Sequence, residues 1–573
     1  MIKIVFVSKI LSFFVSFYIK IQKIYLRFTL CVFIKNNFKK IAQIFKKGLY
    51  KHNILCYNIS KKHIGMVKKL ERIAIIDLGS NTARLLLVDV KENGHFQIVD
   101  QLKEAPRLGE GMERDGFLKP ARIQETIKTL KMFRKLCDVN GIERIIAVAT
   151  AAVRRAKNQR SFLDEVSATC GIKLRVLSAE EEAIYVYRGV INTMDIPKGL
   201  ILEIGGGSTK IVYYNRRNLL NYETLPFGAI TLTELFASDG LTSAEQAERI
   251  EEFFTEQLKR VEWLKDVDPE ARMIGVGGSF RNLCRMTKIM KKYPLKTIHN
   301  YVVNDDDFNH VYDLLKGLDL DRKKKIKGLS SDRADILPSA LAAVSAFKKY
   351  MNIQNFVISG SGLRTGIMYN YAVPTTLDKP ISDVLTYSLN NLVDFFGCDQ
   401  KHTEQVVNLS IQLFKQLRVL HKFPRQHLKI LKVAAYMYGT GKRVGFYNFE
   451  KHSGYIILNS NIYGITHRDL VLASFVASNT AIEDINPFDW ARYRDLVTDE
   501  DVDVVRKMGT ILRIAGCLDR SLSSVVKGIN CDILGDSVIM KTEVDGDATL
   551  EINAALEIGA DFRKIFKKNL EIL

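Results

Sequence analysis

The chain has 573 residues, of which 47% are hydrophobic, and a formal net charge of +20. Its length predicts about three or four domains. Residues 1–65 hold thirteen Lys and Arg and no acidic residue, so the rest of the chain is only mildly basic, with 71 basic against 64 acidic residues. This balance suits an anionic ligand without requiring nucleic acid, and no zinc-finger or RNA-binding signature is present. Eight scattered cysteines without a CxxC pair argue against a disulfide framework and favour a reducing, cytoplasmic compartment.

Residues 1–65 differ from the rest in composition. Their apolar runs are interrupted by Lys9, Lys20 and Lys23. No uninterrupted apolar stretch therefore reaches the length of about 18 residues that a membrane-spanning helix needs. We expect that the true start of translation is Met66. The alternatives are a basic amphipathic segment that binds a membrane surface, and a cleaved signal peptide, although no small-residue cleavage site follows the apolar run.

Strand and helix patterns alternate from residue 72 onward, which predicts an α/β architecture. The first elements are two strands around a glycine turn. A long periodic helix follows, and the chain then alternates between short strands and helices. The expected elements are strands at 72–77 and 83–90, a helix near 120–138, a strand at 144–150, a helix near 159–169, a strand at 173–178 and a helix from 179.

A second unit of the same kind begins near residue 198. It also opens with two strands around a glycine turn, at 198–205 and 209–214. The charge run at 321–328 is expected to be a solvated loop. The remaining elements are a third strand from 218, helices within 242–264, a strand at 272–278, a helix at 279–287, and a strand, glycine turn and helix at 355–369.

Helical patterns dominate beyond residue 376 and continue to about 525. Two segments that alternate like strands follow at 537–544 and 548–556, and a helix is expected at 559–570. The sequence therefore predicts an N-terminal extension that precedes the expected start of translation, two α/β lobes, an all-helical domain and a small α+β tail. The expected boundaries are 1–65, 66–190, 191–375, 376–528 and 529–573.

The two glycine turns belong to a repeated segment. IIDLGSNTARLLLV at 75–88 and ILEIGGGSTKIVYY at 201–214 each have two aliphatic residues, an acid, an aliphatic residue, a glycine, small polar residues and an apolar strand. The same hairpin is thus built twice, once at the start of each α/β unit. We expect the two units to face each other across a cleft, with one turn reaching in from each side.

This pair of turns has the chemistry of a phosphate site. Glycines let the backbone approach a ligand, and successive N–H groups in such a turn bind anions. Asp77 and Glu203 are expected to point into the cleft from the strand ends. Because two carboxylates beside a phosphate would repel it, we expect Mg²⁺ to bind between them. Hydroxyl donors are expected from Ser80, Thr82, Ser208 and Thr209.

Two further glycine turns precede helices, GVGGS at 275–279 and SGSGLRTG at 359–366. Helix N-termini that contain glycine are favourable phosphate sites. Each turn taken alone is as often a packing turn as a ligand site. Their presence in the same fold predicts that they line the same cleft, with Gly277, Gly278 and Arg364 in contact with phosphate.

The order of these motifs resembles a known family. The paired hairpins are similar to those of the actin, sugar-kinase and heat-shock ATPase superfamily, whose duplicated lobes have a ribonuclease H-like fold. The order DLGSN, ATAAVRRAKN, SAEEEA, EIGGGST, GVGGS and SGSGLRTG resembles the exopolyphosphatase and guanosine pentaphosphate phosphohydrolase family, over nearly everything from about residue 70. The resemblance implies hydrolysis of the terminal phosphate of inorganic polyphosphate, of guanosine pentaphosphate, or of both, with Mg²⁺.

The resemblance also implies roles for single residues. The first glutamate of the family's EEA motif, Glu181 here, is expected to activate the attacking water, and Arg154 to bind phosphate. Glu203 is expected to act in catalysis as well as in metal binding with Asp77, and Lys210 occupies a position implicated in the family's catalysis. The other phosphate-binding residues implied are Gly79, Ser80 and Asn81 in the first turn and Gly205, Gly206, Gly207 and Ser208 in the second.

Some residues depart from the family pattern. Glu203 replaces an aspartate of the family's DIGGGSTE, which keeps a carboxylate, whereas Lys210 replaces its closing glutamate, which reverses the charge. Lys210 therefore either holds the polyanion or impairs activity. The helical domain resembles the family's HD-like module, but Tyr438 and Gly439 replace its His-Asp pair, so we expect a binding or dimerisation module without a metal site.

The expected function is that of a homodimeric exopolyphosphatase that binds inorganic polyphosphate or guanosine alarmones and not nucleic acid. Membrane association would come only from residues 1–65. Three alternatives stay open: a catalytically impaired regulatory protein that binds polyphosphate or alarmones, a kinase or ATPase of the same superfamily, and a nucleic-acid-binding module. Phosphate release from polyphosphate without nucleotide separates the hydrolase from a kinase, and tight binding without turnover indicates the regulatory protein.

Overall fold

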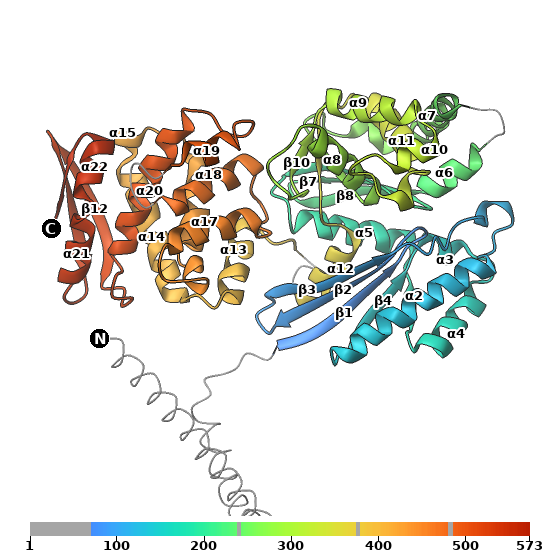
Figure 1. Cartoon of the computed structure of the whole chain (residues 1–573), viewed down its shortest axis with the longest axis horizontal. Coiled ribbons are helices and arrows are strands. Elements are labelled where there is room, and N and C mark those ends of the chain that lie inside the picture. Colours follow the sequence, from blue (N-terminus) through green and yellow to red (C-terminus); the bar gives the residue numbers. More distant parts are fainter. Residues whose placement is uncertain (1–69, 238–241, 374–378, 480–484) are drawn as a thin grey trace, which may run out of the picture. The chain divides into compact units, whose positions relative to one another are not determined.

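The first sheet opens the part of the chain that the structure describes. This computed structural model describes residues 70–237, 242–373, 379–479 and 485–573, so the expectations for residues 1–65 lie outside it (Figure 1). The strand order is β3-β2-β1-β4-β5, with β1 antiparallel to β2 and parallel to β4. These strands are β1 (Leu70–Leu78), β2 (Ala83–Lys91), β3 (Phe96–Glu104), β4 (Arg144–Ala149) and β5 (Leu174–Val176).

The second sheet repeats the topology of the first. Its order is β10-β11-β9-β6-β7-β8, and the order β8-β7-β6-β9-β11 corresponds to β3-β2-β1-β4-β5. The duplication expected from the two hairpins is therefore present in the fold. The strands are β6 (Lys198–Ile204), β7 (Thr209–Asn215), β8 (Asn218–Leu225), β9 (Arg272–Val276), β10 (Tyr301–Val303) and β11 (Phe356–Ile358).

Helices cover both faces of each sheet, which explains the nearly continuous apolar runs of the central strands. In β1, Ala74, Ile76 and Leu78 face one core while Ile73 and Ile75 face the other. The helices of the first lobe are α2 (Pro120–Val139), α3 (Ala151–Arg155) and α4 (Gln159–Cys170); those of the second are α6 (Ala229–Leu235), α7 (Ser243–Lys259), α8 (Gly278–Met290), α9 (Asp305–Lys316), α10 (Leu320–Lys324) and α11 (Leu337–Tyr350). The loop expected at 321–328 is thus partly wrong, because its first residues belong to α10.

Two helices connect the lobes by crossing each other. Helix α5 (Ala179–Ile191) packs on the second sheet, and α12 (Leu363–Ala372) packs on the first. Glycines allow the close approach: a Cβ on Gly189 would collide with the carbonyl group of Gly362, and one on Gly366 with that of Tyr185. Each lobe is therefore completed by a helix that arrives from the other part of the chain.

The region beyond residue 379 is helical up to α20, as expected, and its apolar side chains form one core. A lysine and an aspartate connect it to the second lobe, with Lys429 Nζ 2.6 Å from Asp195 Oδ2. The helices are α13 (Val384–Phe395), α14 (Gln400–Gln416), α15 (Arg418–His421), α16 (Leu428–Met437), α17 (Phe449–Asn459), α18 (His467–Ser478), α19 (Pro487–Ala491) and α20 (Asp501–Cys517).

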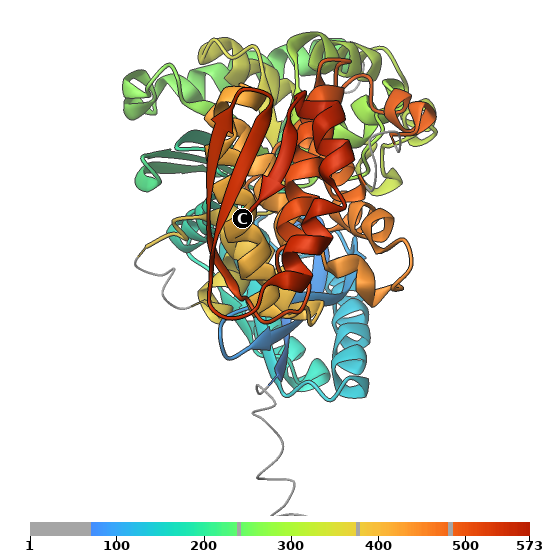
Figure 2. The same ribbon diagram turned by 90° about the vertical axis from the view of Figure 1, so that its left-hand side faces the viewer.

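The C-terminal tail combines a sheet of order β12-β13-β14 with two helices, which Figure 2 shows in red. Its elements are β12 (Val526–Leu534), β13 (Ser537–Val544), α21 (Thr549–Leu556), α22 (Gly559–Phe566) and β14 (Asn569–Ile572). The strand expected at 548–556 is wrong, because this segment forms α21. The apolar side chains of the tail belong to the same core as the helical region, so the two fold as one body.

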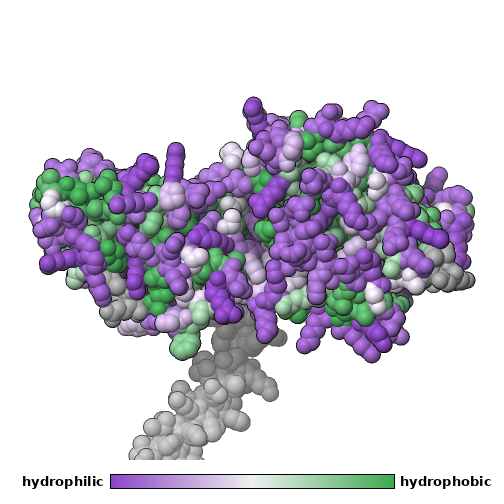
Figure 3. Space-filling view, turned by 90° about the horizontal axis from the view of Figure 1, so that it is seen from above, coloured by the Kyte–Doolittle hydropathy of each residue, from purple (hydrophilic) through white to green (hydrophobic). Residues whose placement is uncertain are grey.

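Hydrophilic residues predominate on the face of the molecule shown in Figure 3. Apolar residues appear there as separate patches among charged ones. Within the described ranges, no helix combines the length and apolar character that crossing a membrane requires.

Candidate active site

The first turn comprises residues 79–82 and connects β1 to β2. The N–H of Gly79 donates to the carbonyl of Thr82 at 3.0 Å and closes the turn. Ser80 and Asn81 are buried, with 5% and 2% of their surfaces exposed. Neither polar atom of the Asn81 side chain has a hydrogen-bond partner in the described part of the chain. A buried amide without partners is costly, so this side chain is arranged for a ligand or water in the adjacent space.

The second turn comprises residues 205–208 and connects β6 to β7. It is closed in the same way, by the N–H of Gly205 donating to the carbonyl of Ser208 at 2.9 Å. It also lies directly against the first turn, because a Cβ on Gly206 would be 3.0 Å from the Cβ of Ser80. The two turns that repeat in the sequence are therefore neighbours in space.

A third turn joins β9 to α8 through Gly277 and Gly278. Gly277 has a φ of 99°, a conformation that favours glycine. A Cβ on Gly278 would collide with the guanidinium group of Arg333, so the backbone contacts that side chain directly. Both glycines line the same cavity as the first two turns.

The three turns enclose a cavity of about 90 Å³, the small cavity. Pockets for drug-sized ligands measure roughly 300–1,000 Å³, so this one suits a phosphate rather than a nucleoside. Its lining comes from both lobes. It consists of Asp77, Gly79, Ser80, Asn81, Thr82, Arg84, Thr150, Ala151, Glu182, Glu203, Ile204, Gly205, Gly206, Gly207, Ser208, Lys210, Gly277, Gly278, Arg281, Arg333 and Leu363.

Three carboxylates line the small cavity, those of Asp77, Glu182 and Glu203. Asp77 forms no ion pair with any residue that the structure describes. Burial raises the pKa of Asp77 above its ordinary value, against the opposing effect of Arg364 and Arg84. The ionised form of this carboxylate is therefore the unfavourable one, and a cation arriving with a ligand would stabilise it.

Four arginines gather in and beside the small cavity: Arg84, Arg281, Arg333 and Arg364. None of them forms an ion pair with a carboxylate in the described ranges. Burial lowers the pKa of all four, to about 10 for Arg333 and Arg364. They still carry their charges at neutral pH, so the site holds a concentrated positive charge that an anion would neutralise.

A second cavity of about 540 Å³, the basic cavity, adjoins the small one, because Arg84 and Arg281 line both. No aspartate or glutamate is among its lining residues. Its other cationic side chains are Lys103, Arg285, Lys296 and Arg364. The cavity continues the positive charge away from the turns, over a space large enough for several linked phosphates.

Comparison with known proteins identifies the group to which this architecture belongs. A sequence model of the Ppx/GppA phosphatase family matches residues 87–373, half of the chain, and a model of Ppx/GppA phosphatase domain III matches residues 384–556. The chain belongs to the Ppx/GppA phosphatase family. The family expected from the motif order is thus confirmed, and with it a hydrolase class of activity.

Solved Ppx/GppA structures resemble about half of this chain. A crystal structure of an exopolyphosphatase from Cytophaga hutchinsonii is 26% identical, covers 53% of this chain and 98% of its own, and superposes with a TM-score of 0.50. A family member from Aquifex aeolicus is also 26% identical, covers 55% of this chain and 100% of its own, and has a TM-score of 0.46. The expected α/β class with an actin-like fold is confirmed, whereas the HD-like nature of the helical region stays a prediction.

Glu181, the residue expected to activate water, does not line the small cavity. Its carboxylate accepts from the N–H of Ser178 at 2.9 Å and from Arg175 at 2.5 Å. The N–H of Glu181 donates back to the Ser178 hydroxyl, so the pair forms a capping box at the start of α5. The next residue, Glu182, is 1% exposed and lines the cavity instead. The S-x-x-E pattern in the sequence is the signal that could have predicted this.

Two further residues expected at the ligand lie behind the cavity wall. The Arg154 guanidinium donates to Glu182 Oε2 at 2.5 Å and to the carbonyl of Leu177 at 2.8 Å, so it holds the glutamate rather than a phosphate. The Thr209 hydroxyl donates to the carbonyl of Phe227 at 2.8 Å. The other residues expected to bind phosphate line the small cavity, except Arg364, which lines the basic cavity.

The magnesium site expected at Asp77 and Glu203 does not fit the residues present. Lys210 Nζ lies 2.9 Å from Glu182 Oε1 and 3.4 Å from Glu203 Oε2, so an ammonium group already contacts two of the three carboxylates. The described ranges hold no group of three or more His, Cys, Asp or Glu side chains arranged for a metal ion. Because Mg²⁺ requires free oxygen ligands in near-octahedral geometry, these carboxylates do not form a ready site.

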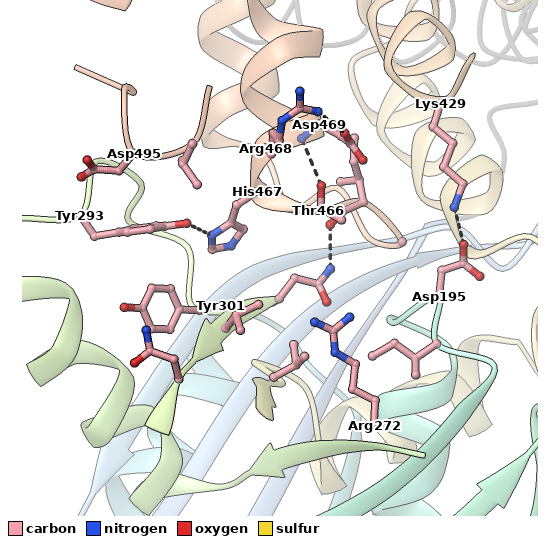
Figure 4. Close-up of a pocket in the computed structure, with 18 of the residues that line it drawn as sticks. Asp195, Arg272, Tyr293, Tyr301, Lys429, Thr466, His467, Arg468, Asp469 and Asp495 are labelled. Atoms are coloured by element: carbon pink, nitrogen blue, oxygen red, sulfur yellow. Dashed lines mark hydrogen bonds and ion pairs between the residues drawn. The ribbon is translucent and has the colours of Figure 1, made fainter. Parts of the chain in front are cut away.

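A third cavity of about 780 Å³, the junction cavity, lies between the second lobe and the helical region (Figure 4). At its wall, His467 Nε2 donates to the carbonyl of His299 and its Nδ1 accepts from the Tyr293 hydroxyl, both at 2.8 Å. The His299 ring accepts from the N–H of Gly360 at 3.2 Å and donates to the carbonyl of Thr193. Burial lowers the pKa of both histidines to about 4, so they are neutral at pH 7. This cavity has no phosphate turn, and most of its charged side chains are paired with one another.

Proposed function

We propose that this chain hydrolyses the terminal phosphoanhydride bond of inorganic polyphosphate. The main support is the small cavity, where the unpartnered amide of Asn81 and arginines without carboxylate partners meet between two glycine turns. A cavity of this size that is lined by guanidinium groups without ion-pair partners suits one terminal phosphate. Guanosine pentaphosphate presents the same terminal group, and it is the second substrate in this proposal.

The substrate chain would continue into the basic cavity. Arg84 and Arg281 line both cavities, so they would contact the bridging region between the first and second phosphates. Charge on the transferring group and on the leaving phosphate would be stabilised by preorganised N–H groups and guanidinium groups. The absence of acidic residues from the basic cavity lining favours a long polyanion over a short one.

Glu182 would orient the attacking water. Its two oxygen atoms are held by Lys210 and Arg154, and a carboxylate retains further lone pairs for a water molecule. The water oxygen attacks the terminal phosphorus, the bond to the bridging oxygen breaks, and the shortened polyphosphate leaves with the electrons of that bond. The proton that the water loses ends on a phosphate oxygen of the products. Little base strength is required, because positioning and charge stabilisation supply most of the catalysis in phosphoryl transfer. Magnesium enters this proposal only as the counter-ion that polyphosphate carries.

A pair of adjacent glutamates provides the test. Glu182→Gln should lower the rate of phosphate release from polyphosphate by roughly 10²–10⁴-fold. Glu181→Gln is the matched control, because it changes the same group one residue away, outside the cavity. It should keep nearly normal turnover and nearly normal stability, because glutamine at this position also completes the capping box. Near-normal turnover in a folded Glu182→Gln variant would refute the assignment.

A second function, regulatory binding of polyphosphate or alarmones without hydrolysis, is favoured by one observation. Lys210 engages both Glu182 and Glu203, which limits the freedom of the carboxylates to act on water. Stoichiometric binding of polyphosphate together with no release of phosphate would support this function over hydrolysis. The homodimer expected from the family stays a prediction.

A further inference from the structure

Lys210 is a buried ammonium group placed where two carboxylates meet. It lies in β7 directly opposite Glu203 in β6, and only 5% of its surface is exposed. Its Nζ contacts Glu203 Oε2 and, from α5, Glu182 Oε1. Burial alone would lower the pKa of Lys210, but the two carboxylates raise it above its ordinary value. The group is therefore charged whenever the protein is folded near neutral pH.

The contacts of Lys210 leave this set of side chains electrically balanced. Glu182 and Glu203 carry two negative charges, and Lys210 and Arg154 carry two positive ones. Both oxygen atoms of Glu182 are bound to a cation. A divalent ion between the same carboxylates would lie beside the ammonium group and would lose these oxygen atoms as ligands, so Coulomb repulsion and the lack of ligands both oppose it.

We propose that Lys210 is a built-in cation that takes the place of a divalent metal between Glu182 and Glu203. The enzyme without substrate then binds no divalent ion at these carboxylates, and Lys210 acts as a positioning residue that fixes the Glu182 carboxylate at the cavity wall. This inference rests on the proposed function only for the role of Glu182. The occupation of the site by an ammonium group in place of a metal stands on the contacts alone.

The test measures binding of Mn²⁺ to the full chain without phosphate or polyphosphate, by electron paramagnetic resonance of the free ion and by titration calorimetry. Wild type and Lys210→Arg should bind Mn²⁺ no better than Asp77→Asn. Lys210→Glu should bind one ion per chain at least about tenfold more tightly than wild type, because a repelling cation becomes another carboxylate ligand. Its thermal midpoint should rise with Mn²⁺, since an ion that binds only the folded state stabilises it.

Two additional variants keep the test decisive. Lys210→Gln replaces the ammonium group with a neutral amide, so the carboxylates of the folded protein repel one another less than in Lys210→Glu. This variant should still bind Mn²⁺ more tightly than wild type. Lys348→Gln removes another buried lysine, one that pairs with Asp305, and should gain none. The proposal is overturned if wild type binds one Mn²⁺ that Glu203→Gln abolishes, or if neither folded Lys210 variant binds more tightly than wild type. Because no substrate is used, a chain that fails to hydrolyse polyphosphate leaves this result unaffected.

Discussion

The hairpins β1–β2 and β6–β7 have the same backbone but use their cations differently. In each, an acid at the strand end faces a basic residue across the pair, Asp77 opposite Arg84 and Glu203 opposite Lys210. Lys210 is held by carboxylates, whereas Arg84 forms no ion pair with a described residue and lines both adjoining cavities. Lys210 pairs with Glu203 of its own hairpin and also with Glu182, which α5 brings to the second hairpin.

This comparison shows that a basic residue near a phosphate cavity is not necessarily a phosphate ligand. A carboxylate that arrives from another element can neutralise a cation and make it part of the wall. The cation without such a partner is the one available to an anion. The hairpin of the first lobe is therefore expected to bind substrate, and that of the second lobe to be held together internally.

The largest expected effect is on stability. Lys210→Met should lower the free energy of unfolding by about 3–5 kcal/mol, because it leaves buried carboxylates without their cation. Arg84→Met should lower it by less than about 1 kcal/mol, the range of changes that break no buried pair. Urea denaturation of both variants measures the difference. Equal losses would show that the two cations are used alike.

The next effect concerns substrate binding, where the substitution of Arg84 should have a larger effect than the substitution of Lys210. Arg84→Met should weaken polyphosphate binding by about 1.5–3 kcal/mol, the value of a charged hydrogen bond, which corresponds to a rise in KM of roughly 10- to 100-fold. The loss should shrink at high salt, where the interaction is screened. Kinetics at two ionic strengths would measure this. An unchanged KM would remove Arg84 from the substrate path.

Glycine substitutions compare the two turns themselves. A Cβ on Gly206 would press against the first turn, 3.0 Å from Ser80 Cβ and 3.1 Å from the Asn81 nitrogen, whereas one on Gly79 would meet only the Thr82 carbonyl oxygen at 3.3 Å. Gly206→Ala should therefore destabilise the protein by about 1–3 kcal/mol, and Gly79→Ala by less. Thermal unfolding ranks the two variants, and the opposite order would contradict the close contact between the turns.

The smallest expected effect is a change in pH dependence. Asp77 has a folded-state pKa above its ordinary value of 3.8. Between these two values the folded protein binds more protons than the unfolded one, so stability falls as pH rises through that window. Asp77→Asn should remove this fall and raise the free energy of unfolding at pH 7 by about 1 kcal/mol, a usual size for a single substitution. Glu203→Gln should lower stability, because Glu203 pairs with Lys210. Denaturation at pH 4 and pH 7 checks both signs.

Contiguous motifs made much of the site predictable from the sequence. The duplicated acid, glycine and small polar residues mark both turns. The glycines at 277 and 278 were also predictable, because they stand between a strand and the start of a helix. Arg84, Arg281 and Arg333 were not predictable, because they come from separate segments and a single arginine has no local pattern. Only the packing of the lobes brings them to one cavity.

Two expectations depended on patterns that have a second interpretation. The assignment of water activation to Glu181 followed a family motif and stays a prediction, while Ser178 three residues earlier indicates that this glutamate caps a helix. The segment 548–556 alternates like a strand, but its leucine, alanine and glutamate residues also favour a helix, and the shared core of the tail selects α21. In both segments the same residues are compatible with two interpretations, a catalytic motif or a helix cap at Glu181, and a strand or a helix at 548–556.

His299 gives the helical region a mechanical connection to the basic cavity. Its carbonyl is held by His467 at the start of α18, while its ring holds the backbone of Gly360, which lines that cavity. If α18 moves and the bond between His467 and the His299 carbonyl is kept, His299 must move with it. The ring of His299 then changes its position relative to the N–H of Gly360. The helical region is thus coupled to the wall along which the substrate tail would run. Protonation of the His299 ring near pH 4 would remove the Nδ1 acceptor of the Gly360 N–H and break this connection, whereas His467 would keep its bond to the His299 carbonyl.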